Sequence, residues 1–213
     1  LQIADVPALS GELEFASATG LGRARLQLPT TQFDADHARL STLLQTTALP
    51  GDILAGHLSA QADLDIARSP TGSLQMSGPL ALQLEGISGF AGETAIAGLS
   101  AQWQGRLDSG TLHSERPTRV SIENLDPGIA LHNLQAAIAM DAGARVLSLT
   151  ELSLEAFGGR VTSQGGEFSL DGPAGMLELQ LERIDVERIL ALGAYEGVLA
   201  SGLPGSFLVR GCR

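Results

Sequence analysis

The amino-acid sequence alternates between apolar and polar residues along most of its length. In residues 57–66 the apolar side chains occupy every even position and the polar side chains every odd position. A period of two is that of a β-strand with one dry face, because successive side chains point to opposite sides of a sheet. The same period recurs in residues 80–84, 120–123, 134–140, 147–154, 168–170 and 177–181. The pattern predicts a chain built mainly of strands.

Clusters of Gly, Pro, Asp and Ser separate these segments. Examples are residues 77–79, 126–128 and 171–173, and the Phe-Gly-Gly of residues 157–159 is typical of a hairpin turn. Gly accepts a positive φ, and Pro and Asp favour the first positions of a turn. The clusters recur about every 8 to 20 residues, which favours an antiparallel meander over strands that alternate with helices.

Two segments depart from this alternation. Residues 34–44 and residues 184–193 carry apolar residues at helical spacing, and Asp185 is in the position of an N-cap. We therefore predict an all-β fold, in which a long, twisted and curled antiparallel sheet forms a groove, with one or two short helices. No linker divides residues 1–213, and the strand pattern is already complete in residues 11–15. We expect a single fragment of a larger β-groove protein.

Charge and cysteine content exclude several kinds of partner. The formal net charge is -11, all thirteen basic residues are arginine, and they form no cluster larger than Arg116 with Arg119. Nucleic acid is not expected as a partner, because its binding requires a basic surface that displaces counterions. Cys212 is the only cysteine, so neither an intrachain disulfide nor a cysteine metal cluster can form.

The sequence contains no pattern typical of a catalytic centre. His37 lies near Asp34 and Asp36, a grouping that we interpret as the solvated first turn of a helix and not as a metal site. Asp63 and Asp65 share one strand face and could act as acid and base only if buried, but that face is the polar one. A Gly-x-Ser-x-Gly motif is absent. We predict no enzyme activity, no metal and no cofactor.

A long meander with one apolar face must cover that face. It can fold into a filled sandwich, or it can curl into a trough whose lining receives a ligand. The aromatic content of 4% favours the trough, because Leu, Ala, Val and Ile leave room. At about 0.8 kcal/mol for each buried CH₂, a chain of about sixteen carbons would cost roughly 12 kcal/mol to expose. About fourteen strands spaced by ~4.8 Å would give roughly 65 Å of track.

The alternation also assigns the residues of the lining. These parity assignments would be inverted by a register slip of one residue. The predicted lining consists of Leu58, Leu64, Ile66, Leu82, Leu84, Ile122, Leu134, Ile138, Leu154, Leu179 and Leu181.

Four pieces of the C-terminal half occur in a characteristic order. They are residues 126–134, residues 152–161 with their Gly-Gly strand, residues 181–190 with an Ile-Asp-x-x-x-Ile-Leu helix, and residues 197–205 with a Gly-x-Leu-Pro end. Together, over residues 126–204, they resemble the C-terminal region of the YdbH family, which belongs to the AsmA-like group that includes TamB. An older domain label for this family is dicarboxylate transport.

The resemblance implies a periplasmic protein, anchored in the inner membrane of a Gram-negative cell, whose β-groove carries phospholipids toward the outer membrane. It also implies phospholipid acyl chains as the cargo, a small outer-membrane lipoprotein of the YnbE type as a partner, and a membrane anchor outside this fragment. Two alternatives remain open: a β-sandwich or solenoid that binds protein without lipid cargo, and a carrier of small dicarboxylates that uses Arg116 and Arg119.

Overall fold

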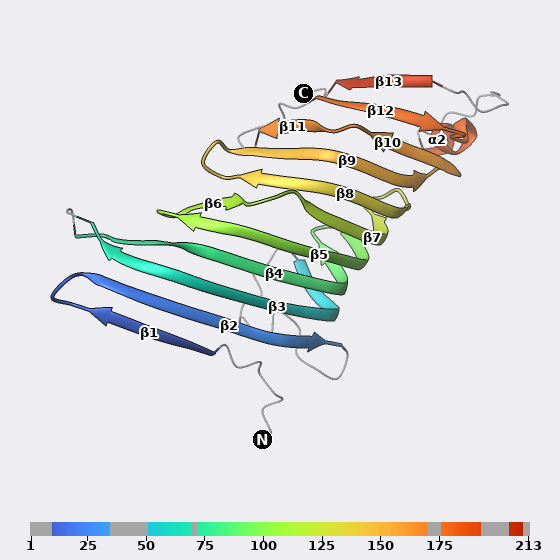
Figure 1. The fold of residues 1–213 in the computed structure, drawn as a ribbon. Coiled ribbons are helices and arrows are strands. Elements are labelled where there is room, and N and C mark those ends of the chain that lie inside the picture. The colour runs from blue at the N-terminus through green and yellow to red at the C-terminus, as the bar shows by residue number, and fades with distance from the viewer. Residues whose placement is uncertain (1–9, 35–50, 70–71, 170–175, 193–204, 211–213) are drawn as a thin grey trace.

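The computed structural model describes residues 10–34, 51–69, 72–169, 176–192 and 205–210. In these ranges the chain forms one 13-stranded antiparallel sheet and one short helix (Figure 1), which confirms the predicted fold class. The strands are β1 (Ser10–Ala16), β2 (Leu21–Phe33), β3 (Gly51–Arg68), β4 (Leu74–Ala91), β5 (Thr94–Asp108), β6 (Thr111–Ser114), β7 (Thr118–Asp126), β8 (Leu131–Asp141), β9 (Val146–Ala156), β10 (Gly159–Ser163), β11 (Gly166–Ser169), β12 (Met176–Glu182) and β13 (Gly205–Arg210).

The sheet is a meander in which each strand pairs with the next, with two exceptions. The short strands β6 and β7 both pair with β5 and β8, so they share one row. Likewise β10 and β11 share the row beside β9. Thirteen strands therefore make eleven rows, and ten spacings of ~4.8 Å give a sheet about 48 Å long. The described rows therefore span less than the expected 65 Å, because a count of strands does not reveal which of them lie end to end.

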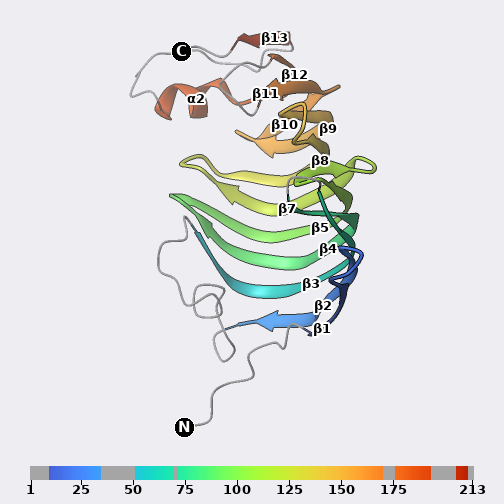
Figure 2. The same cartoon turned by 90° about the vertical axis from the view of Figure 1, so that its left-hand side faces the viewer.

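Bulges bend the longest strands along a common line. The register shifts between Leu28 and Thr31 of β2, twice between Ile53 and His57 of β3, and between Leu84 and Ile87 of β4. Because a bulge bends its strand and increases its twist, bulges in neighbouring rows fold the whole sheet in one place. Figure 2 shows the resulting curvature of the strands.

Most of the predicted turns that fall on described residues are reversals. Phe157 and Gly158 have φ values of 51° and 75° in the turn between β9 and β10, and the carboxylate of Asp126 accepts a 2.9 Å hydrogen bond from the Gly128 backbone N–H.

The turn predicted at residues 77–79 was wrong, because these residues lie inside β4. Gly78 has a φ of 153°, and a Cβ there would overlap the carbonyl oxygen of Asp63. Glycine at this position serves the close approach of two strands and not a reversal.

The helix predicted for residues 184–193 is present as α2 (Val186–Leu192). The Asp185 carboxylate accepts hydrogen bonds from the backbone N–H groups of Glu187 at 3.0 Å and Arg188 at 3.4 Å, which confirms Asp185 as the N-cap. The helix predicted for residues 34–44 lies outside the described residues beyond Asp34.

Two apolar clusters hold the described sheet together. One, in the N-terminal rows, joins Ala24, Leu64 and Ile66. The other, in the C-terminal rows, joins Leu154, Ala156, Val161 and Ile184, which lies between β12 and α2. Between these clusters, Thr118 is only 7% exposed, and its hydroxyl has no hydrogen-bond partner among the described residues.

Replacement of Thr118 by valine is expected to stabilise the protein by about 1 kcal/mol, because it removes a buried hydroxyl that lacks a partner and keeps the shape of the side chain. Thr150→Val is the matched control. Its hydroxyl donates a 3.2 Å hydrogen bond to the Ala137 carbonyl, so its loss should lower stability by up to about 1 kcal/mol. Urea unfolding measures both. A Thr118→Val protein less stable than the wild type would contradict the assignment.

Candidate functional site

The register of the sheet gathers apolar residues on one face. Directly paired residues of antiparallel strands share a face, as do residues i and i+2 of one strand. A single line of pairs therefore crosses six strands from β3 to β9. It runs through Leu58, Leu84, Ala101, Val120, Ala136 and Leu152.

All eleven residues predicted to form the lining lie on this face. Leu64, Ile66 and Leu154 are buried, with exposed fractions of 6%, 8% and 9%, and the other eight are half-buried. The sheet thus brings together side chains that are far apart in sequence, such as the directly paired Ile122 and Leu134. That these side chains contact lipid stays a prediction.

The opposite face is polar and open to solvent. On β3 and β4 the exposed side chains of Gln61, Asp65, Gln83 and Glu85 alternate with buried or half-buried apolar ones. Extensive contacts in the described residues run only between neighbouring rows, so no second layer accounts for this difference. In a curled single layer, side chains crowd together on the concave side and spread apart on the convex side. The apolar face is therefore the more sheltered of the two.

A hollow of about 600 Å³ lies over the N-terminal half of the apolar face. Its lining comes from β2 to β6 and β8, and is almost entirely hydrocarbon. It includes Leu26, Leu28, Ala60, Ala62, Leu80, Leu82, Trp103, Leu112 and Met140. The room arises because small alanines are paired with leucines, as Ala60 is with Leu82 and Ala62 with Leu80.

Trp103 is held in place within this lining. Its Nε1–H donates a 3.0 Å hydrogen bond to the Ser114 hydroxyl, and its ring lies over Gly105, where a Cβ would overlap it. The same hydroxyl accepts a hydrogen bond from the Met140 backbone N–H at 3.0 Å. The indole therefore buries its polar atom without a desolvation penalty and leaves an apolar surface toward the hollow.

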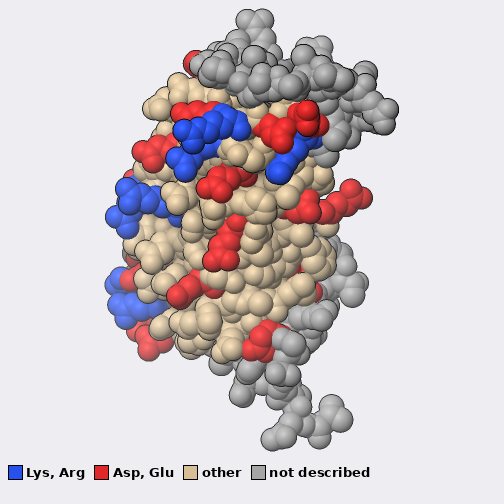
Figure 3. All heavy atoms as spheres, turned by 90° about the vertical axis from the view of Figure 1, so that its right-hand side faces the viewer, with Lys and Arg blue, Asp and Glu red and all other residues tan. Residues whose placement is uncertain are grey.

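The apolar face remains open at its N-terminal end. Leu13 and Leu26 are 69% and 40% exposed there, because β1 is the last described row. On the side of the molecule that carries α2, basic side chains lie toward the C-terminal end and along one edge, and acidic side chains are scattered across the surface (Figure 3).

Sequence reasoning missed the contribution of β2 to this face. Ala24, Leu26 and Leu28 alternate with Arg23, Arg25 and Gln27, so the period of two was present. The arginines and the adjacent Pro29 obscured the pattern.

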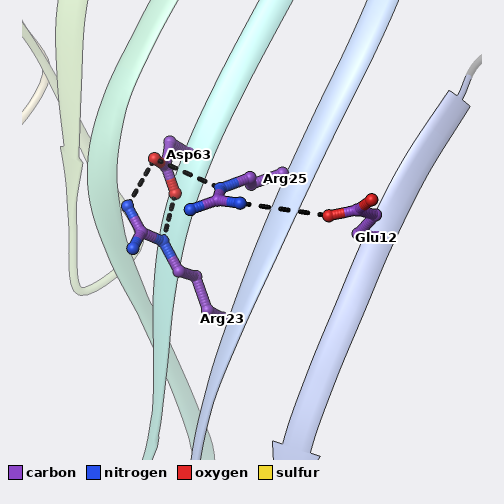
Figure 4. Close-up of polar contacts among 4 residues, drawn as sticks. All are labelled: Glu12, Arg23, Arg25 and Asp63. Carbon is purple, nitrogen blue, oxygen red and sulfur yellow. Dashed lines mark hydrogen bonds and ion pairs between the residues drawn. The ribbon is translucent and has the colours of Figure 1, made fainter.

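Asp63 belongs to an ion-pair network on the polar face and not to an acid–base pair (Figure 4). Arg23 donates two hydrogen bonds to its carboxylate, at 2.7 Å from Nε and 2.6 Å from the second terminal nitrogen. Arg25 lies 3.8 Å from the same carboxylate and 3.9 Å from that of Glu12, so the network links β1, β2 and β3. The hydrogen bond from Arg23 holds the pKa of Asp63 below its ordinary value.

The structure brings none of the remaining chemical candidates that it describes into a site. His37 and Cys212 lie outside the described residues, and the part of the chain that the structure describes holds no group of three potential metal ligands. Arg116 and Arg119 are both exposed. None of the helical turns within the described ranges has the length and hydrophobicity needed to cross a lipid bilayer.

We expect Arg23→Gln to raise the pKa of Asp63 toward its ordinary value. Because the folded-state pKa is lowered, the network stabilises the protein above the unfolded-state pKa of about 3.9, and this contribution is lost as the pH falls through the folded-state value. Carboxyl ¹³C NMR titration measures the shift, with Arg106→Gln as the control outside the network. An unchanged Asp63 pKa in Arg23→Gln would rule out Arg23 as its cause.

Comparison with known proteins identifies the family. The model of the YdbH-like family, described as intermembrane phospholipid transport protein YdbH, matches residues 4–203. The sequence motifs placed the specific resemblance in residues 126–204, and the match extends it through the N-terminal strands. No curated protein and no solved structure matches the chain. Because the match covers nearly all of the 213 residues, the chain belongs to the YdbH-like family of intermembrane phospholipid transport proteins.

Proposed function

We propose that this chain is a segment of a periplasmic protein that moves phospholipids between the inner and outer membranes, and that its concave apolar face shelters their acyl chains. The observation that carries the proposal is the continuity of that face. One line of apolar residues crosses from β3 to β9, and apolar pairs such as Val161 with Leu181 extend the face into the C-terminal rows.

The free-energy cost of exposing acyl chains to water explains why an apolar face would help a lipid to cross. Exposure of about sixteen methylene groups to water costs roughly 12 kcal/mol, which would nearly prevent a bare lipid from crossing an aqueous space. A track of hydrocarbon side chains about 48 Å long removes most of that barrier over its length. The mechanism is passive: acyl chains lie against the eleven predicted lining residues and their neighbours, and head groups stay at the hydrated rim.

The proposal also includes the wider setting of the chain, which the family match supports only in general terms. The fragment lies within a longer groove whose parent protein is anchored in the inner membrane. A small outer-membrane lipoprotein of the YnbE type receives the lipid at the far end. Residues 1–213 form one continuous stretch of this groove, and the acidic convex face is in contact with the periplasm.

The chief alternative is a structural or protein-binding module without lipid cargo. The two buried clusters around Leu64 and Leu154 favour it locally, because those side chains already bury each other. The hollow between β2 and β8 favours the conduit, because its hydrocarbon lining is left uncovered by the described residues. The measurement of bound lipid separates the two.

Leu82→Glu should reduce the phospholipid that co-purifies with the chain by on the order of tenfold, because a carboxylate on the concave face must be desolvated beside an acyl chain. Its matched control is Gln83→Glu, which places the same charge one residue further along β4, on the exposed polar face. Mass spectrometry of extracted lipids gives the comparison. A second variant, Ala60→Phe, fills the hollow opposite Leu82 without adding charge and should act in the same direction.

The proposed lipid conduit would be contradicted if the same amount of lipid co-purified with Leu82→Glu, Ala60→Phe and Gln83→Glu. Wild-type chain that carries no phospholipid after exposure to vesicles would favour the structural module. Circular dichroism confirms that each variant keeps the sheet before the lipid is counted.

A further inference from the structure

Three of the thirteen arginines converge at the C-terminal end of the described sheet. Arg160 is in β10, Arg183 directly follows β12, and Arg188 is in α2. All three line one hollow of about 780 Å³, together with apolar residues that include Ile129 and Phe157. This end is where Figure 3 shows basic side chains gathered between acidic ones. The convergence stands out in a chain whose net charge is -11.

The turn between β9 and β10 brings these arginines together. The backbone N–H of Asp185 donates a 2.9 Å hydrogen bond to the Phe157 carbonyl, which fixes the turn against the start of α2. Two glycines permit the close contact. A Cβ at Gly159 would overlap the Glu182 carbonyl oxygen, and one at Gly158 would lie 3.7 Å from a terminal nitrogen of Arg188.

Hydrogen-bond donors remain available in this hollow. Among the described residues, Arg160 and Arg183 form no ion pair within 4.0 Å, and Arg188 contacts Asp185 through Nε at 3.3 Å, with 64% of its side chain exposed. Two carboxylates also line the hollow, but Glu155 accepts a hydrogen bond from Asn133 at 3.2 Å. With Asp185, which pairs with Arg188, three guanidinium groups are balanced by three carboxylates, and the guanidinium groups of Arg160 and Arg183 keep donors for an anionic ligand.

The hollow lies at the rim where the two faces meet, because Arg160 is paired with Glu155 and Glu182 on the polar face while other wall residues reach the apolar cluster. Ala156, which is 4% exposed, belongs both to its wall and to the buried cluster with Leu154 and Val161, and Phe157 packs against that cluster. A ligand here would contact hydrocarbon on one side and guanidinium groups on the other. Guanidinium donors match the oxygens of a phosphate in geometry and charge, so the ligand chemistry is that of an amphiphile with a phosphate.

We propose that Arg160, Arg183 and Arg188 bind the phosphodiester head group of a phospholipid whose acyl chains lie on the concave face. This inference rests on the proposed function and specifies where on the groove a head group is held. The site is a stopping point at the rim: the arginines contact the head group, and the cluster around Leu154 receives the first methylene groups of the chains.

The test is calorimetric titration of the whole chain with dihexanoylphosphatidylethanolamine below its micelle concentration. Arg160→Gln and Arg183→Gln should each weaken binding on the order of tenfold, because each removes charge-assisted hydrogen bonds to phosphate. Arg183→Lys should retain most of the affinity. Arg106→Gln, which removes an exposed arginine of β5 on the polar face, is the matched control and should leave binding unchanged.

The outcomes separate this site from the proposed function. Equal binding by Arg160→Gln, Arg183→Gln and wild type, with lipid uptake still sensitive to Leu82→Glu, would overturn the head-group site and leave the conduit intact. Inorganic phosphate that binds as tightly as the lipid, with the same dependence on arginine, would make this a site for free phosphate and overturn the assignment to lipid. Failure of the wild-type chain to bind the short-chain lipid or to take up vesicle lipid would overturn both.

Discussion

Hydrogen bonding between neighbouring strands in a single layer is the constraint on which the rest of this structure depends. Each row satisfies its backbone groups with the rows beside it, and the pleat sends alternate side chains to opposite sides. Without a described second layer, one face can be hydrocarbon only if the sheet shelters it by its own shape. Curvature is therefore part of what makes this sequence compatible with water.

Small residues and bulges produce that curvature and keep the apolar side spacious. The bulges of β2, β3 and β4 lie in neighbouring rows, so they bend the strands together. Alanines such as Ala60 and Ala62 leave the hollow that leucines in both positions would fill. Phe15 and Trp103 are two of the aromatic residues on this side, and both rings lie over a glycine, at Gly22 and Gly105, so they lie flat against the sheet.

Charge follows the same division between faces. Acidic residues and the Arg23–Asp63 network occupy the polar side, where they are hydrated and tie the first three strands to each other. At the C-terminal rim, a tight turn brings three arginines beside the apolar cluster. This end of the sheet therefore places guanidinium groups and hydrocarbon next to each other.

The sequence by itself determined most of the strands, the face of the eleven predicted lining residues and the family. Alternation is a local pattern, so residues 57–66 by themselves indicate which of their side chains share the apolar face. The face of Leu58 or Leu181 can be assigned without knowing the partner strand. The Asp185 N-cap and the turn at Phe157 and Gly158 are equally local. The turn predicted at residues 77–79 was wrong because Gly78 permits the close approach of Asp63 on the neighbouring strand. That contact joins residues distant in sequence, so no local pattern reveals it.

Only the tertiary structure decided what depends on pairing between rows. It placed β6 with β7 and β10 with β11, which shortened the track, and it set Arg23 against Asp63 and Arg160 beside Arg183 and Arg188. It also curved the sheet, because curvature arises from bulges shared by several strands. These pairings and contacts cannot be inferred from residue type, because each joins residues that only the register between strands brings together.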